Sequence, residues 1–209
     1  NYVTGNKSAN DTEGVWPDDT ADPFDNPRIE YLSEYLHRTA GKALGLVTTA
    51  DVYDATPAAN AVHTGSRRAG TGIVDQYLDD RALTGLAVLM GGGRGWFLPS
   101  GSAGSMRSAR TDYQLSSALQ RGWGAAPGGI DPSRDLIADF RGAGFQYVSN
   151  AHELTEARAD APLLGLFAYG NMNVAYDPRI DQIVGFGDVT LDINAWMECN
   201  PGAVTTASC

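Results

Sequence analysis

The sequence predicts an α/β fold, a three-layer α/β/α sandwich around a largely parallel sheet. Short apolar runs of strand length alternate along residues 27–170 with segments whose apolar residues recur at helical spacing. Strands that are apolar along their whole length are typical of parallel sheets with helices on both faces. Ligands gather at the carboxyl ends of the strands in such sheets, so we expect functional residues there.

The first half of the chain predicts two helix–strand units. Asn26 and Pro27 suit the start of a helix, since asparagine accepts from exposed backbone N–H groups and proline fits the first helical position. An apolar stripe follows, and Gly41 ends that helix. A buried strand is expected over 44–49, a second helix around residues 73–78 and a second strand over 86–90. The helical positions are Ile29, Leu32, Tyr35, Leu36 and Ala40 in the first unit and Ile73, Val74, Tyr77 and Leu78 in the second.

The second half continues the alternation with one interruption. Asp131-Pro132 is predicted to begin a helix that carries Leu136, Ile137 and Phe140, with strands over 145–148 and 163–168 after it. Residues 99–111 are rich in Gly and Ser and predict a mobile surface loop. We interpret the whole chain, 1–209, as one partial domain: a polar loop region over 1–26, an α/β core over 27–170 and a peripheral loop excursion over 171–209.

Composition and charge exclude some classes of partner. Of 209 residues, 43% are hydrophobic, and 25 acidic residues outnumber 15 basic ones, for a net charge of −10. Such a surface repels nucleic acid and anionic membranes, so we expect no nucleic acid binding. No apolar run approaches the roughly 20 residues of a membrane span. Cys199 and Cys209 enclose a short loop and form a candidate disulfide, which favours an exported protein.

Asp54 and Thr56 are the candidate metal ligands. They follow an apolar strand and stand two residues apart, so their side chains share a side in extended backbone. A carboxylate and a hydroxyl are hard oxygen ligands suited to Mg²⁺. In the alternative interpretation, Thr56 caps a helix that begins at Pro57.

Arg67 is the candidate phosphate-binding and catalytic residue. A guanidinium fork can grip two phosphate oxygens, although Arg67-Arg68 also fits a solvated basic pair. A straight helix from Pro57 would carry Arg67 roughly 15 Å away along its axis, so Gly65 is expected to end the helix and turn the chain back. His63 is expected to be a packed, hydrogen-bonded histidine. Gly91-Gly92-Gly93 fits a tight exit from a strand better than a phosphate loop.

These segments together resemble the bacterial alkaline phosphatase family. The resemblance rests on the motif at 54–59 with His63 and Arg67, and on the segments 46–49, 89–93 and 163–172, which occur in family order. Thr4-Gly5-Asn6-Lys7 is similar to the family's segment just after its nucleophile. The similarity runs from the first residues to about Met172.

The resemblance implies hydrolysis of phosphate monoesters through a phosphoserine intermediate, with two Zn²⁺ ions and one Mg²⁺, by a periplasmic or secreted homodimer. Asp54 and Thr56 match the family's Mg²⁺ ligands, and Arg67 matches its phosphate-binding arginine. The nucleophilic serine and the zinc ligands have no counterpart here, so the chain resembles a central fragment that is expected to be inactive alone. Two alternatives stay open: a non-catalytic protein that binds phosphate or a partner, and a related metallohydrolase of phosphodiesters or sulfate esters.

Overall fold

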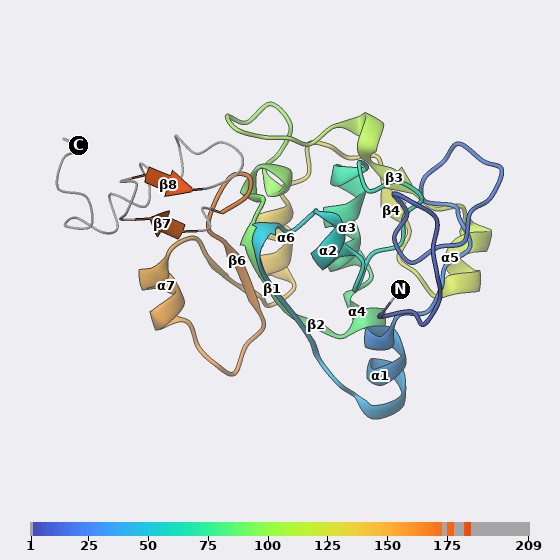
Figure 1. The fold of residues 1–209 in the computed structure, drawn as a ribbon, viewed down its shortest axis with the longest axis horizontal. Coiled ribbons are helices and arrows are strands. Elements are labelled where there is room, and N and C mark those ends of the chain that lie inside the picture. The colour runs from blue at the N-terminus through green and yellow to red at the C-terminus, as the bar shows by residue number, and fades with distance from the viewer. Residues whose placement is uncertain (1, 173–174, 178–181, 185–209) are drawn as a thin grey trace.

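The centre of the molecule is a parallel sheet of four strands in the order β1-β2-β6-β5 (Figure 1). The structure, a computed structural model, describes residues 2–172, 175–177 and 182–184. Two antiparallel pairs, β3–β4 and β7–β8, stand outside this sheet. The strands are β1 (Leu44–Asp51), β2 (Leu86–Gly92), β3 (Tyr113–Gln114), β4 (Gly128–Gly129), β5 (Gln146–Val148), β6 (Leu163–Leu166), β7 (Ala175–Asp177) and β8 (Gln182–Val184).

Helices flank the sheet, and the predicted α/β class is confirmed. On one face the buried side chains of Leu46, Leu89 and Leu164 join those of α3 and α6 in the main core. On the opposite face Val47 is 70% exposed. The helices are α1 (Leu32–Ala40), α2 (Ala55–Ala58), α3 (Gly70–Asp79), α4 (Arg81–Thr84), α5 (Ser117–Trp123), α6 (Leu136–Gly142) and α7 (Ala151–Glu156), with 3₁₀ turns η1 (Arg94–Phe97) and η2 (Ala109–Thr111).

The segment that follows β6 is hydrogen-bonded near the carboxyl ends of both β1 and β2. The pairing of β1 with β2 shifts register between Val47 and Asp51, and Asp51 is again paired with Gly92. Residues 167–172 reach both strands: the Met172 amide donates to the Thr49 carbonyl (2.8 Å), and the Gly93 amide donates to the Gly170 carbonyl (2.8 Å). A side chain on Gly92 would collide with the Gly170 carbonyl, and Gly93 has a φ of 95°. The predicted tight exit at Gly91–Gly93 is confirmed, and only glycine suits both of these positions.

β1 and β5 are the edge strands of this sheet. Within the ranges that the structure describes, no strand pairs with the outer side of β1, which is eight residues long. β1 lies along the middle of the view in Figure 1 and leads into α2.

The predicted helix start at Asn26-Pro27 is wrong. Residues 27–30 are extended, because the Trp16 amide donates to the Pro27 carbonyl (2.9 Å) and the Ile29 amide to the Gly14 carbonyl (2.8 Å). α1 begins at Leu32, and the Glu34 carboxylate accepts from the Tyr31 amide at 2.8 Å. Pairing with the N-terminal segment thus overrides the local signal of Asn-Pro.

The predicted helix start at Asp131-Pro132 is also wrong. α6 begins at Leu136 and is capped by Asp135, whose Oδ1 accepts from the Ala138 amide at 3.0 Å. Asp131 is engaged elsewhere, since its amide donates to Asp112 Oδ2 at 2.9 Å. Asp131 and Asp135 are both suitable N-caps in the sequence. Asp135, which is nearer the apolar residues of the helix, is the one that caps it.

The Gly/Ser-rich segment 99–111 is anchored at its second half. Residues 100–104 are exposed, as a surface loop requires, but Arg107 is buried. Arg107 Nη1 and Nη2 donate to the two carboxylate oxygens of Asp75 on α3, at 2.7 and 2.8 Å. A buried guanidinium–carboxylate fork fixes this part of the segment to the core.

Several predictions concern the C-terminal part of the chain. Most of the expected loop excursion 171–209, with Cys199 and Cys209, lies outside the described residues. The described helices include none long and apolar enough to cross a membrane.

Replacing Arg107 with methionine should strongly destabilise the protein. Asp75 and Arg107 have side chains 1% and 0% exposed, so the variant buries a carboxylate that has lost its main partner. Losing one member of a buried pair costs on the order of 3–5 kcal/mol. Thermal unfolding should show a clear drop in Tm. The control is Arg110→Met, because Arg110 follows three residues later and is exposed. The Tm of this variant should stay near that of the wild type. Equal Tm values for the two variants would contradict the anchoring role.

Candidate functional site

Asp54 caps the one-turn helix that follows β1. Its Oδ1 accepts from the Ala55 amide at 2.8 Å, and α2 begins at Ala55. The predicted helix cap at Thr56 is therefore wrong: Thr56 is already inside the first turn, where it is exposed. Among the described residues, neither Asp54 Oδ2 nor the Thr56 hydroxyl makes a hydrogen bond, so both oxygens remain open to other ligands.

Arg67 lies beside Asp54, and its Nη2 forms an ion pair with Asp54 Oδ1. The expected long helix from Pro57 does not form, because α2 ends at Ala58 and the chain has turned before Gly65. The side chains of Arg67 and Asp54 are 42% and 40% exposed, so the pair is accessible from solvent. The structure thus joins two of the three predicted site residues directly and places the third in the adjoining turn.

The backbone around Arg67 is held by the N-terminal segment. The Arg67 amide donates to the Asp11 carbonyl at 2.8 Å, and Glu13 and Thr64 exchange two backbone hydrogen bonds of 2.8 and 3.0 Å. From the other side, the Gln76 side chain on α3 bonds both the amide and the carbonyl of His63, each at 3.0 Å. These contacts fix where the guanidinium emerges.

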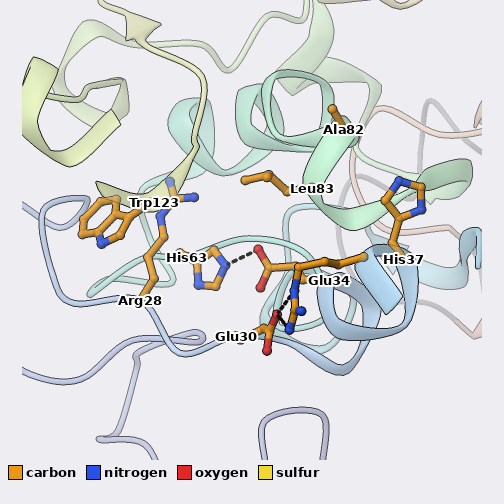
Figure 2. A pocket seen from close by; sticks show the side chains of 9 residues that line it. Arg28, Glu30, Glu34, His37, His63, Ala82, Leu83 and Trp123 are labelled. Atoms are coloured by element: carbon orange, nitrogen blue, oxygen red, sulfur yellow. Dashed lines mark hydrogen bonds and ion pairs between the residues drawn. The ribbon is translucent and has the colours of Figure 1, made fainter. Parts of the chain in front are cut away.

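His63 is a packed, hydrogen-bonded histidine, as the sequence predicts (Figure 2). Its Nδ1 donates to the Gly14 carbonyl at 2.8 Å, and its Nε2 faces Glu34 Oε1 at 3.2 Å. Burial acts to raise the pKa of Glu34, but the hydrogen bonds from His63 and from the Tyr31 backbone leave it below its ordinary value. His63 therefore ties α1 to the loop that carries Arg67.

Glu13 is a buried carboxyl group near this pair. It is 2% exposed, and neither carboxyl oxygen has a hydrogen-bond partner among the described residues. Burial raises the pKa of Glu13 to about 8; Arg67 lowers it and Asp54 raises it. Glu13 is thus largely protonated and uncharged at neutral pH. Asp54, not Glu13, is therefore the carboxylate that pairs with Arg67. Sequence analysis missed it, because a glutamate in a polar segment carries no signal of burial.

An open hollow of about 490 Å³ lies at the carboxyl edge of the sheet, with Asp54 in its lining. Asp51, the last residue of β1, also lines it: its Oδ1 accepts from the Tyr53 amide (3.0 Å) and its Oδ2 from Trp96 Nε1 (3.1 Å). Burial raises the pKa of Asp51 to about 6 despite these bonds. Asn171 Oδ1 accepts from the Asp51 amide at 2.7 Å. Asp51 was missed as well, although its place at a strand end could have identified it.

A second hollow, of about 470 Å³, lies beside α1 and is less suited to a ligand (Figure 2). Its charged groups pair with one another or with the core: His63 with Glu34, Arg38 with Glu30, and Arg28 with Asp80. Arg28 also stacks on Trp123, 4.8 Å from the ring centroid, and its unpartnered Nε and Nη2 are out of reach of solvent. A ligand would have to break these contacts to gain its own.

Three carboxylates, those of Asp75, Asp112 and Asp131, lie close enough to share a metal ion. Arg107 already binds Asp75 with two donors, and Arg134 lies 3.7 Å from Asp75. Burial raises the pKa of Asp75 to about 6, and Arg107 is the main opposing influence. Guanidinium groups fill the position of a cation here, so we interpret this cluster as structural.

The comparisons with known proteins address the family. The family model described as alkaline phosphatase matches residues 1–183. The chain belongs to the alkaline phosphatase family. An alkaline phosphatase of Escherichia fergusonii is 33% identical over 179 residues, which cover 84% of this chain and 34% of that protein. This chain thus spans about a third of the length of that relative.

Solved alkaline phosphatases share the fold. The Thermus thermophilus enzyme aligns with a TM-score of 0.58 and 26% identity, over 94% of this chain and 33% of that one. A mutant of the TAB5 alkaline phosphatase, with Mg bound, aligns with a TM-score of 0.56 over 82% of this chain and 38% of that one. At 18% identity, the second match bears on the fold alone.

Glu13→Gln should remove part of the pH dependence of stability. Native Glu13 keeps its proton up to about pH 8, whereas the unfolded chain releases it near the ordinary value of 4.5. Between these values the unfolded state binds fewer protons, so the contribution of Glu13 to stability is full below pH 4.5 and is lost as pH rises through 8. The Tm of the variant should match the wild type near pH 5 and exceed it near pH 8.

The control is Asp19→Asn, at an exposed carboxylate of the same N-terminal region. Its Tm should follow the wild type at every pH. If Glu13→Gln also ran parallel to the wild type from pH 5 to pH 8, Glu13 would titrate as an ordinary solvated carboxylate.

Proposed function

We propose that this chain supplies the magnesium- and phosphate-binding part of an enzyme that hydrolyses phosphate monoesters. The observation that supports this most directly is the ion pair of Asp54 and Arg67, thirteen residues apart, at the carboxyl edge of a parallel sheet in a chain of this family. Neither residue is needed there for the core, since both side chains are about 40% exposed. Opposite charges held at a sheet edge without burial suit a ligand site.

Arg67 binds the phosphoryl group. Its Nη2 is paired with Asp54 Oδ1, and its side chain is 42% exposed. Guanidinium groups bind phosphate oxygens through two parallel N–H donors, with geometry that lysine does not match. Because the backbone of Arg67 is braced by Asp11 and by the Glu13–Thr64 pairing, the donors are placed before substrate arrives.

Asp54 and Thr56 would hold the magnesium ion. The donor set fits: the free Oδ2 of Asp54 and the free hydroxyl of Thr56 are hard oxygen ligands on one short turn. A bound divalent cation would offset charge on the phosphoryl oxygens and lower the pKa of a coordinated water. Asp54 Oδ1 meanwhile stays engaged with the α2 backbone and Arg67, so one carboxylate links the arginine to the metal position.

The rest of the proposed enzyme lies outside this chain. We expect the serine that forms the phosphoserine intermediate and the ligands of two Zn²⁺ ions to come from other segments of the protein, with this segment inactive by itself. Export to the periplasm or the medium, a disulfide between Cys199 and Cys209, and a homodimer complete the proposal. An aryl phosphate assay of the complete gene product tests it, and inactivity in the presence of Zn²⁺ and Mg²⁺ would favour a non-catalytic phosphate-binding protein.

Arg67→Ala in the complete protein should lower kcat/KM for an aryl phosphate by on the order of 10²–10³, as expected for one strong transition-state contact. Steady-state kinetics of the wild type and the variant measures this change in kcat/KM. The neighbouring Arg68→Ala is the control, because Arg68 is exposed and Asp54 forms its ion pair with Arg67 instead. Unchanged kinetics for Arg67→Ala, or equal losses in both variants, would remove Arg67 from the phosphate site.

Asp54→Asn should weaken activation by Mg²⁺ while the fold is retained, because asparagine also caps helices. Titration of activity with Mg²⁺, with Mg²⁺ binding measured by calorimetry, should show a higher half-saturating concentration. Thr56→Val should also raise the half-saturating concentration of Mg²⁺. If added Mg²⁺ acted alike on the wild type and both variants, the ligand assignment would be wrong.

A further inference from the structure

The lining of the hollow beside Asp54 combines two kinds of side chain. Asp51, Asp54 and Asn171 contribute polar groups, and Tyr53, Trp96 and Met106 contribute two aromatic rings and a thioether. Its volume of about 490 Å³ is in the range of small-molecule sites. Since Asp54 belongs both to this lining and to the pair with Arg67, the hollow adjoins the proposed phosphate site.

The aromatic rings and the thioether of the lining are held in place by neighbouring residues. The rings of Tyr53 and Trp96 lie 4.7 Å apart at 45°, and Trp96 Nε1 donates to Asp51 Oδ2 at 3.1 Å. A side chain on Gly70, at the start of α3, would touch the Trp96 ring, so the ring is packed from that side too. The Met106 amide donates to the Gly95 carbonyl at 2.9 Å, which keeps this thioether near the rings.

These side chains are fixed yet not buried. Tyr53 and Trp96 are half-buried, and Met106 is 37% exposed. Aromatic rings and a thioether present faces that favour flat, polarisable partners. The charges around them are carboxylates, so the organic part of a ligand at this place should be uncharged or cationic rather than anionic.

From this arrangement we propose that Tyr53, Trp96 and Met106 bind the organic group of the phosphate ester and favour planar aromatic groups over small alkyl ones. The inference rests on the proposed function and adds the substrate class: aryl or similarly flat monoesters. The phosphoryl group is held at Arg67, and the ring of the ester lies against Trp96 and Tyr53. The three residues determine specificity and take no part in bond breaking.

The test compares phenyl phosphate with ethyl phosphate as substrates of the complete protein. The two leaving groups differ in reactivity, so the measured quantity is the change in their kcat/KM ratio from wild type to variant. Trp96→Ala should lower the preference for phenyl phosphate roughly 3- to 10-fold, the effect of one aromatic contact. Tyr53→Ala should act in the same direction, and Trp96→Phe should keep most of the preference. Trp16→Ala, at a tryptophan 44% exposed far from the hollow in sequence, is the control and should leave the ratio unchanged.

A second measurement avoids leaving-group chemistry and serves if Trp96→Ala folds poorly. Phenylphosphonate and methylphosphonate are not hydrolysed, and their inhibition constants against ethyl phosphate report binding alone. The wild type should bind phenylphosphonate more tightly, and Tyr53→Ala should narrow the difference.

The outcomes separate the two proposals. Failure of the wild type to hydrolyse either ester overturns the proposed function. Hydrolysis of both esters, with ratios and inhibition constants unchanged in Trp96→Ala and Tyr53→Ala, overturns the aromatic subsite and leaves the proposed function standing.

Discussion

The hydrogen bonding of residues 167–172 to the ends of β1 and β2 is the constraint on which the candidate site depends. The Met172 amide donates to the Thr49 carbonyl and the Gly93 amide to the Gly170 carbonyl, so this segment is fixed beside the register shift between the two strands. Asp51 is thereby turned toward Asn171 and Trp96. A side chain at position 92 would collide with the Gly170 carbonyl, and one at position 93 would collide with the Asp51 carboxylate, so glycine is required at both positions.

Arg67 depends on contacts from distant parts of the chain. The guanidinium is adjacent to Asp54 only because the loop between α2 and α3 is bonded to Asp11 and Glu13 on one side and to Gln76 on the other. The polar N-terminal region is therefore part of the framework of the site, with Val15 and Phe24 buried beneath it. Function at this edge is coupled to a region that has little secondary structure of its own.

Sequence reasoning worked where a single physical signal dominated. The apolar runs at β1, β2 and β6 predicted the strands of a parallel sheet correctly. The predicted burial of the strand over 44–49 is wrong, since only Leu46 among those residues is buried and Val47 is 70% exposed. Helix starts failed where two caps competed or where a long-range pairing replaced the helix, as at Pro27 and Asp131. Spacing alone could not place Arg67 beside Asp54, and the family motif was needed for that expectation. Glu13 was missed because the burial of one glutamate in a polar segment cannot be predicted from the sequence. Asp51 was missed although its place at the end of a predicted strand pointed to it.

The outer side of β1 gives this fold a practical consequence. No described strand pairs with the outer side of β1, which is eight residues long, and Val47 on this strand is an exposed apolar side chain. An uncovered edge of this length is a template for strand addition by another molecule. Recombinant work on this stretch by itself would therefore encounter self-association, and a charged residue in place of Val47 would be a rational first step toward keeping it monomeric.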